Sequence, residues 1–190
     1  VIAVGDAGTA IKGQLTSPGA FAQLNVPSVF DLNDVATNGN ALTIAGDNGN
    51  LLYTANYTTN VLPGGAAMEV LPFNGGDVSG VTHRGSTSDV FAVGAHAMVH
   101  RTTGDARLVI HDVFPSALND AHFTTSGTEG YVVGDNLLAR HTVDGGITWE
   151  VVPVQGSGVL SKLLTVWTEA PGVADAGGTE GTWLQFNGNA

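Results

Sequence analysis

Polar and aromatic side chains able to bind a ligand recur in four short segments of the chain. LNDVAT (32–37) and LNDAHF (118–123) both contain an Asn-Asp pair, VSGVTH (78–83) ends in a histidine, and LLTVWT (163–168) contains a tryptophan. Amide, carboxylate, imidazole, guanidinium and indole groups gathered in one place are typical of a recognition surface. The candidate binding residues are Asn33, Asp34, His83, Arg84, Asn119, Asp120, His122 and Trp167. The alternative is turn chemistry, which Asn-Asp pairs also supply.

The six histidines raise the question of a metal site. His96 and His100 are the main candidates, with His83 and His122 expected on neighbouring strands. However, His96 aligns with turn residues of the preceding repeats, so His96 and His100 do not share a regular strand. Two imidazoles without a fixed third ligand do not match the spacing of zinc sites. We therefore expect neither a metal site nor another cofactor.

Composition argues against several classes of partner. The formal net charge is −11, with six Lys and Arg against seventeen Asp and Glu, so the chain lacks the basic surface that holds nucleic acid or anionic lipid. No apolar run is long enough to span a bilayer. The sequence contains no phosphate-binding loop, nucleophile elbow or dinucleotide fingerprint. We expect no nucleic-acid binding and no membrane insertion.

A repeat must position the candidate residues. Five apolar runs each end in a glycine, and these glycines recur about every 40 to 48 residues, at Gly5, Gly46, Gly94, Gly134 and Gly177. Each run passes through a tight turn into a second alternating run, and further short alternating runs lie upstream and downstream, giving four strands per unit. No window has a sustained helical period. The pattern predicts an all-β fold, a β-propeller of four-stranded antiparallel blades, with a β-sandwich as the alternative.

The repeat register divides the chain as one propeller domain over 1–190. It predicts a partial blade at 1–28, complete blades at about 29–73, 74–115 and 116–156, and a partial blade at 157–190. The two end pieces duplicate rather than complement each other. This arrangement favours a fragment of a larger ring over a five-bladed ring with two incomplete blades, since exposed blade edges invite aggregation.

The stretch HTVDGGITWE (141–150) resembles the Asp-box of the BNR repeat family, whose members are β-propellers, and the VGDNG-type hairpins resemble its Ycf48-like subgroup, named after a photosystem II assembly factor. In that family the box is a structural hairpin turn away from the catalytic face. The resemblance implies that an acceptor carboxylate, positive-φ glycines and a packed indole fold this turn. The structural residues are Thr142, Asp144, Gly146, Thr148 and Trp149.

The same family includes sialidases, which use three arginines, a Tyr nucleophile with a Glu partner, and an Asp acid/base. The four arginines here are Arg84, Arg101, Arg107 and Arg140, and no segment matches the family's arginine-bearing N-terminal motif. Arg101 and Arg140 occupy equivalent repeat positions. We expect no catalytic residues and no enzyme, with a sialidase-like hydrolase fragment kept as an alternative.

These observations predict a non-catalytic scaffold that recognises protein or glycan. Scarce lysine, abundant Gly, Thr and Asn, and a glycosylation sequon at Asn56 favour an extracellular, cell-surface or periplasmic location. Cysteine is absent, so its spacing gives no information on the redox compartment. A third possibility is a subunit of a larger surface or filamentous assembly, in which another chain pairs with the open end blades by strand addition.

Overall fold

A computed structural model describes residues 1–13, 19, 21–58, 68–71, 73, 76–95, 97–101, 108–111, 114–154 and 161–187. The described chain is all-β, as predicted, and its helical segments are three short 3₁₀ turns, η1 (Asp6–Gly8), η2 (Asp135–Leu137) and η3 (Thr179–Gly181). None of these helical segments has the length and apolar character needed to cross a membrane.

The strands form five antiparallel sheets, and within each sheet consecutive strands are neighbours. The first sheet holds β1 (Ile2–Gly5), β2 (Thr9–Lys12) and β3 (Ala22–Gln23); the second holds β4 (Leu32–Asn38), β5 (Ala41–Gly46), β6 (Asn50–Thr54) and β7 (Glu69–Leu71). The third sheet holds β8 (Val78–His83), β9 (Val90–Gly94), β10 (Met98–Arg101) and β11 (Leu108–His111). The fourth holds β12 (Leu118–Phe123), β13 (Gly130–Gly134), β14 (Ala139–Thr142) and β15 (Glu150–Val151); the fifth holds β16 (Leu163–Ala170), β17 (Val173–Gly178) and β18 (Trp183–Asn187).

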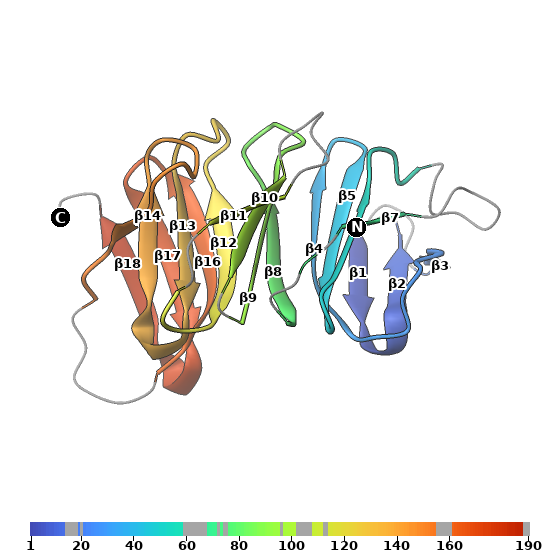
Figure 1. The fold of residues 1–190 in the computed structure, drawn as a ribbon, viewed down its shortest axis with the longest axis horizontal. Helices are drawn as coiled ribbons and strands as arrows, with labels where there is room; N and C mark the ends of the chain where they lie inside the picture. The colour runs from blue at the N-terminus through green and yellow to red at the C-terminus, as the bar shows by residue number, and fades with distance from the viewer. Residues whose placement is uncertain are drawn as a thin grey trace.

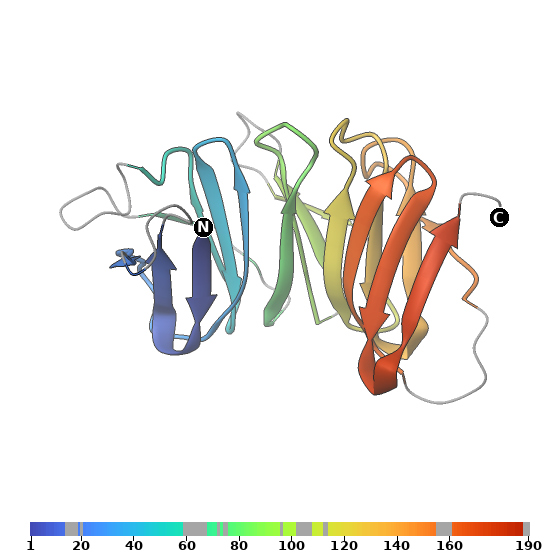
Figure 2. The same ribbon diagram turned by 180° about the vertical axis from the view of Figure 1, so that it is seen from behind.

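The five sheets stand side by side in one row, with the N-terminal sheet at one end and the C-terminal sheet at the other (Figures 1 and 2). The strands β4, β8, β12 and β16 contact one another in that order along the row. We call these four the inner strands. They contain the four short segments named above, which carry all the candidate binding residues except Arg84.

Each junction between neighbouring sheets has its own apolar core, because the central strands bury both of their faces. In β9, which is wholly buried, Val90 and Ala92 pack with the second sheet, whereas Phe91 and Val93 pack with the fourth. This split follows from the two-residue period of a strand. A buried sheet of this kind is stable only between two neighbours, which explains why the repeat forms a row.

Four hairpin turns share one backbone conformation, and they join β1 to β2, β5 to β6, β13 to β14 and β17 to β18. Their central residue has a left-handed φ between 52° and 59°, and this residue is Ala7, Asn48, Asn136 or Glu180. Glycine usually follows in the same conformation, and at Gly8 a Cβ would meet the Ser28 carbonyl oxygen at 2.0 Å. The recurring Gly-Asp segments therefore form tight hairpin turns.

All four inner strands contain a register shift at the same place, as in a β-bulge. The shift falls between Leu32 and Asp34 in β4 and between Leu118 and Asp120 in β12, with equivalents in β8 and β16. A bulge re-aims the side chains around it. Here it lets Asn33 and Asn119 reach the neighbouring sheet, as the hydrogen bonds below show.

Candidate functional site

The inner strands line a depression of about 530 Å³, which we call the inner-strand depression. Five of the eight candidate residues line it, namely Asp34, His83, Asp120, His122 and Trp167. Asn33, Arg84 and Asn119 are not among its lining residues. The fold thus brings five side chains from four sheets to one depression, whereas the three remaining candidates, although adjacent to them in sequence, do not line it.

Asp34 and Asp120 each connect their own inner strand to the next one. Asp34 accepts hydrogen bonds from the Val35 N–H at 2.7 Å and, across the junction, from the Val81 N–H at 2.8 Å. Asp120 accepts equivalent bonds from its following residue and from the Val166 N–H, and its Oδ2 also accepts from the Thr165 hydroxyl at 2.9 Å. Because backbone donors occupy both carboxylates, their first role is to join sheets.

Burial makes the charged forms of these two carboxylates costly. Burial raises the pKa of Asp34 above its usual value, against the opposing effect of the Val81 hydrogen bond. Burial likewise raises the pKa of Asp120 to about 6, and the nearby Asp34 charge adds to the increase. The hydrogen bonds therefore offset the loss of hydration only in part.

Asn33 and Asn119 are also junction residues. Each side-chain amide donates one hydrogen bond to an Asp in the turn of its own sheet and another to a backbone carbonyl at the start of the next inner strand. The acceptors are Asp47 Oδ1 (2.9 Å) and Val78 O (3.1 Å) for Asn33, and Asp135 Oδ1 (3.0 Å) and Leu163 O (2.8 Å) for Asn119. Turn chemistry, the alternative interpretation, accounts for the bonds to Asp47 and Asp135 in each residue's own sheet. It does not account for the bonds across the junction to Val78 and Leu163.

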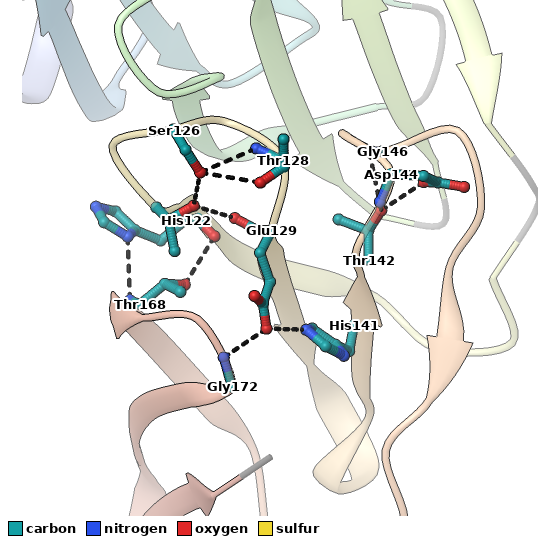
Figure 3. Close-up of polar contacts among 11 residues, drawn as sticks. His122, Ser126, Thr128, Glu129, His141, Thr142, Asp144, Gly146, Thr168 and Gly172 are labelled. Carbon is teal, nitrogen blue, oxygen red and sulfur yellow. Dashed lines mark hydrogen bonds and ion pairs between the residues drawn. The ribbon is translucent and has the colours of Figure 1, made fainter.

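His122 and Trp167 form an aromatic pair on adjacent inner strands. Their ring centroids lie 4.1 Å apart at an interplanar angle of 31°, and 61% of the Trp167 surface is exposed. His122 Nδ1 accepts a hydrogen bond from the Thr168 N–H at 3.1 Å, and the Thr168 hydroxyl donates to the His122 carbonyl at 2.9 Å (Figure 3). Burial lowers the pKa of His122, so at neutral pH the ring is uncharged and its proton lies on Nε2.

His83 and Arg84 are adjacent in sequence but have different environments. His83 is buried, which lowers its pKa; its Nε2 lies 3.4 Å from the Thr43 hydroxyl, and its Nδ1 has no hydrogen-bond partner within the described part of the chain. Arg84 forms an ion pair of 2.5 Å with the buried Asp89. The Arg84 charge is therefore compensated inside the third sheet.

An acid and histidine pair recurs in the third and fourth sheets and was missed by the sequence analysis. Glu129 Oε1 lies 2.7 Å from His141 Nε2 and accepts a 2.6 Å hydrogen bond from the Gly172 N–H of the fifth sheet (Figure 3). In the third sheet Asp89 lies 4.0 Å from His100. The sequence does contain a signal for this pair. An acidic residue stands two positions before an aromatic residue of a central strand (Asp89 and Phe91, Glu129 and Tyr131), and a histidine follows on the next strand (His100, His141).

The turn with the Asp-box resemblance lies between β14 and β15 and is organised by Asp144. This carboxylate accepts hydrogen bonds from the Thr148 hydroxyl (2.6 Å) and from the Ile147 and Thr148 N–H groups. The Thr142 hydroxyl also donates to it, at 2.8 Å, as Figure 3 shows. These bonds, with the Thr148 hydroxyl first, lower the pKa of Asp144 to about 2. The turn is closed by its own side chains.

Trp149 and Gly146 fasten the same turn to the core. The Trp149 Nε1–H donates to the Gly146 carbonyl at 3.2 Å, and the indole meets Phe91 and Phe123 edge-on at 6.3 and 5.9 Å. Gly146 has a φ of 87°, and a Cβ there would lie 2.4 Å from the Phe91 ring. A residue with a side chain would therefore be both strained and overpacked at position 146.

Neither a metal site nor a cluster of arginines is found in the described residues. Those residues contain no group of three His, Asp or Glu able to hold a metal ion, and His96 lies outside them. Arg84 is paired with Asp89, and Arg140 packs over the Phe114 ring at 5.9 Å. Arg107 and the Arg101 side chain also lie outside the described part. Neither Arg84 nor Arg140 lines the inner-strand depression.

Comparisons with known proteins place the chain by its fold. No protein-family model matches it, and no curated protein matches it. Among solved structures, YCF48 bound to D1 peptide has a TM-score of 0.69 at 12% identity, over 98% of this chain and 59% of that chain. U3-55K gives 0.77 at 12% identity over 100% and 57%, and the WD40 β-propeller domain of Doa1 gives 0.70 at 12% identity over 100% and 62%.

The chain spans about three fifths of the length of these solved structures. Identities of 12% show a shared fold and leave the membership in the BNR family, and the Asp-box itself, as predictions. The five antiparallel sheets in one row, with an apolar core at each of the four junctions, agree with these likenesses. The chain has a β-propeller fold.

Proposed function

We propose that this protein is a non-catalytic scaffold that recognises a segment of another protein on its inner strands. The observation that carries the proposal is the 61% exposure of Trp167, which packs against His122 at the inner-strand depression. Tryptophan concentrates binding energy at interfaces because it offers a large, rigid contact area. A large indole left in water beside a polar depression is therefore best explained by a partner that covers it.

A protein partner is favoured over a glycan by analogy. The neighbour YCF48 is a propeller described as bound to a D1 peptide, and this chain shares its fold. A glycan could also stack on an indole, so glycan binding is the competing outcome. Assembly into a larger complex and an extracellular, cell-surface or periplasmic location remain predictions from the sequence.

A binding role is also favoured over catalysis by the state of the carboxylates. Asp34 and Asp120 are the acidic residues of the depression with raised pKa values, but backbone N–H groups already occupy their oxygens. A general acid or base must instead reach a proton of the substrate. The arrangement of these carboxylates supports a scaffold.

The test is selection of a random peptide library on the wild-type protein, followed by affinity measurements on Trp167→Ala and Trp183→Ala. Trp183 is a matched control because it is 65% exposed but lies on β18, outside the depression. We expect Trp167→Ala to weaken binding of selected peptides about tenfold or more, a typical loss for a tryptophan at an interface centre, and Trp183→Ala to have less than about a twofold effect.

Thermal melts of both variants establish that they remain folded. Equal losses in the two variants, or no loss in either, would contradict the assignment of the site. Saturable binding on a glycan array that depends on Trp167, without any selected peptide, would replace the protein partner by a glycan.

A further inference from the structure

We infer that the inner-strand surface is built for a cationic peptide segment, with an Arg or Lys side chain of the partner laid on Trp167 and flanked by Glu169. This inference rests on the proposed function and specifies the chemistry of the partner.

Thr165 and Trp167 lie on one face of β16, because side chains alternate along the regular part of a strand, and Glu169 lies at a second register shift, between Thr168 and Ala170. All three line the inner-strand depression, together with Asp120 and His122 of the adjacent β12. Glu169 is exposed and has no hydrogen-bond or ion-pair partner in the described residues. Its carboxylate is therefore available two residues along the strand from the exposed indole.

The indole itself offers the second half of the site. Trp167 packs against His122, with ring centroids 4.1 Å apart at a tilt of 31°, and most of the indole surface is in water. A guanidinium or ammonium group over a tryptophan face is attracted by the ring quadrupole. His122 supports the indole without a competing positive charge, because burial lowers its pKa and its Nδ1 is engaged by the Thr168 N–H.

The charges around the depression favour the same partner. Asp34, Asp120 and Glu169 line it, and none of its described lining residues is Lys or Arg. The nearest arginine in sequence, Arg84, is compensated by Asp89 at 2.5 Å. A net charge of −11 extends this negative potential over the whole protein and steers cations toward it.

A further group points to a ligand in the depression. His83 lines it and is only 7% exposed, yet its Nδ1 has no hydrogen-bond partner within the described part of the chain. Buried polar atoms are normally paired, because an unpaired one loses its hydration without compensation. A hydrogen-bonding group of the bound segment would pair with this nitrogen.

The experiment uses positional-scanning peptide mixtures that hold Arg, Lys, norleucine or Glu at one fixed position, tested on the wild type, Trp167→Ala, Glu169→Gln and Glu150→Gln. Glu150→Gln is the matched control, because it removes the same charge from an exposed position on β15, outside the depression. We expect the Arg and Lys mixtures to bind about tenfold more tightly than the norleucine mixture. Glu169→Gln should reduce this preference about three- to tenfold, with norleucine binding unchanged, whereas Glu150→Gln should leave both unchanged.

The outcomes separate the two proposals. Equal binding of all four mixtures, still lost in Trp167→Ala, would overturn the cationic partner and keep the proposed function. A preference for Arg and Lys that Glu150→Gln reduces as much as Glu169→Gln would also overturn the site, because the selectivity would then come from overall charge. If no mixture binds, or if Trp167→Ala binds as well as the wild type, the proposed function fails and the inference fails with it.

Discussion

Two aspartates of this chain have opposite pKa shifts because their surroundings differ. Asp144 lies in a surface turn where hydroxyl and N–H donors converge on its oxygens, and its pKa falls to about 2. Asp120 also accepts backbone hydrogen bonds, but burial between two sheets outweighs them and its pKa rises to about 6. Hydrogen bonds thus decide the shift near water, and loss of hydration decides it in the interior.

The Asp144 turn should respond to both mutation and acid. We expect Asp144→Asn to lower the free energy of unfolding by about 1 kcal/mol at neutral pH. Hydrogen bonds to a charged group usually contribute somewhat more, but solvent screens this exposed turn. The folded pKa of about 2 lies below the usual 3.8, so the contribution is fully present above that usual value and is lost as the pH falls toward 2. Urea unfolding of both proteins between about pH 7 and pH 2 measures the difference.

Asp6→Asn is the control, since Asp6 lies in another exposed hairpin turn, η1. The Asp6 variant should have nearly the wild-type free energy of unfolding at neutral pH. A difference between the wild type and Asp144→Asn that does not shrink in acid would mean that the charge of Asp144 is not what closes the turn.

At the scale of the strands, the junctions between inner strands are of two types. Asn-Asp pairs on β4 and β12 donate to and accept from the backbone of β8 and β16, respectively. The junction between β8 and β12 has Gly80 at the equivalent position instead, where a Cβ would lie 2.8 Å from the Asn119 carbonyl oxygen. Polar bridges and close backbone approach therefore alternate along the row.

The polar type of junction can be tested with Asn119→Ala against Ser79→Ala, which changes the equivalent position of β8. Asn119→Ala removes the donor to Leu163 O and Asp135 Oδ1, so we expect a loss of about 1–2 kcal/mol in unfolding free energy. Hydrogen exchange should become faster in β16, whose start loses its anchor, and should be unchanged in β4. Equal losses in the two variants, or exchange that increases evenly along the chain, would contradict this account of the junction.

At the scale of the whole molecule, neighbouring sheets are coupled through shared cores and aromatic layers. Tyr131 stacks on His141 at 4.3 Å within the fourth sheet and on Phe186 of the fifth at 5.3 Å, and Phe91 meets Phe123 across another junction at 4.7 Å. The chain that forms this row has a net charge of −11, so its surface is acidic. Such a surface acts on a charged partner from beyond contact distance.

The long-range field makes the expected cationic binding dependent on salt. Between about 0.1 M and 1 M salt the screening length falls from about 10 Å to about 3 Å. We expect the association rate of the Arg and Lys mixtures to fall about tenfold or more over this range, with a smaller change in the dissociation rate. Surface plasmon resonance measures both rates, and the norleucine mixture provides the uncharged control. Salt sensitivity confined to the dissociation rate would argue against steering by the overall charge.

The sequence by itself determined the secondary structure and the repeat, because both depend on local rules. The segments LNDVAT and LNDAHF form β4 and β12, and the Gly-Asp segments form hairpin turns. Both follow from the sequence because strand alternation and positive-φ turns depend on only a few neighbouring residues. Four strands per unit, arranged as a β-propeller, followed from the period of the repeat. The resemblance to the Asp-box family stays a prediction.

Only the tertiary structure decided what the candidate residues contact. Asn33 reaches a carbonyl 45 residues away, Arg84 turns to Asp89, and Glu129 joins His141 to the fifth sheet. It also decided that Trp167 stays in water while His122 supports it as a neutral ring. These outcomes depend on how one sheet docks against the next, and burial and distance across a junction are properties of the packed sheets that no local pattern specifies.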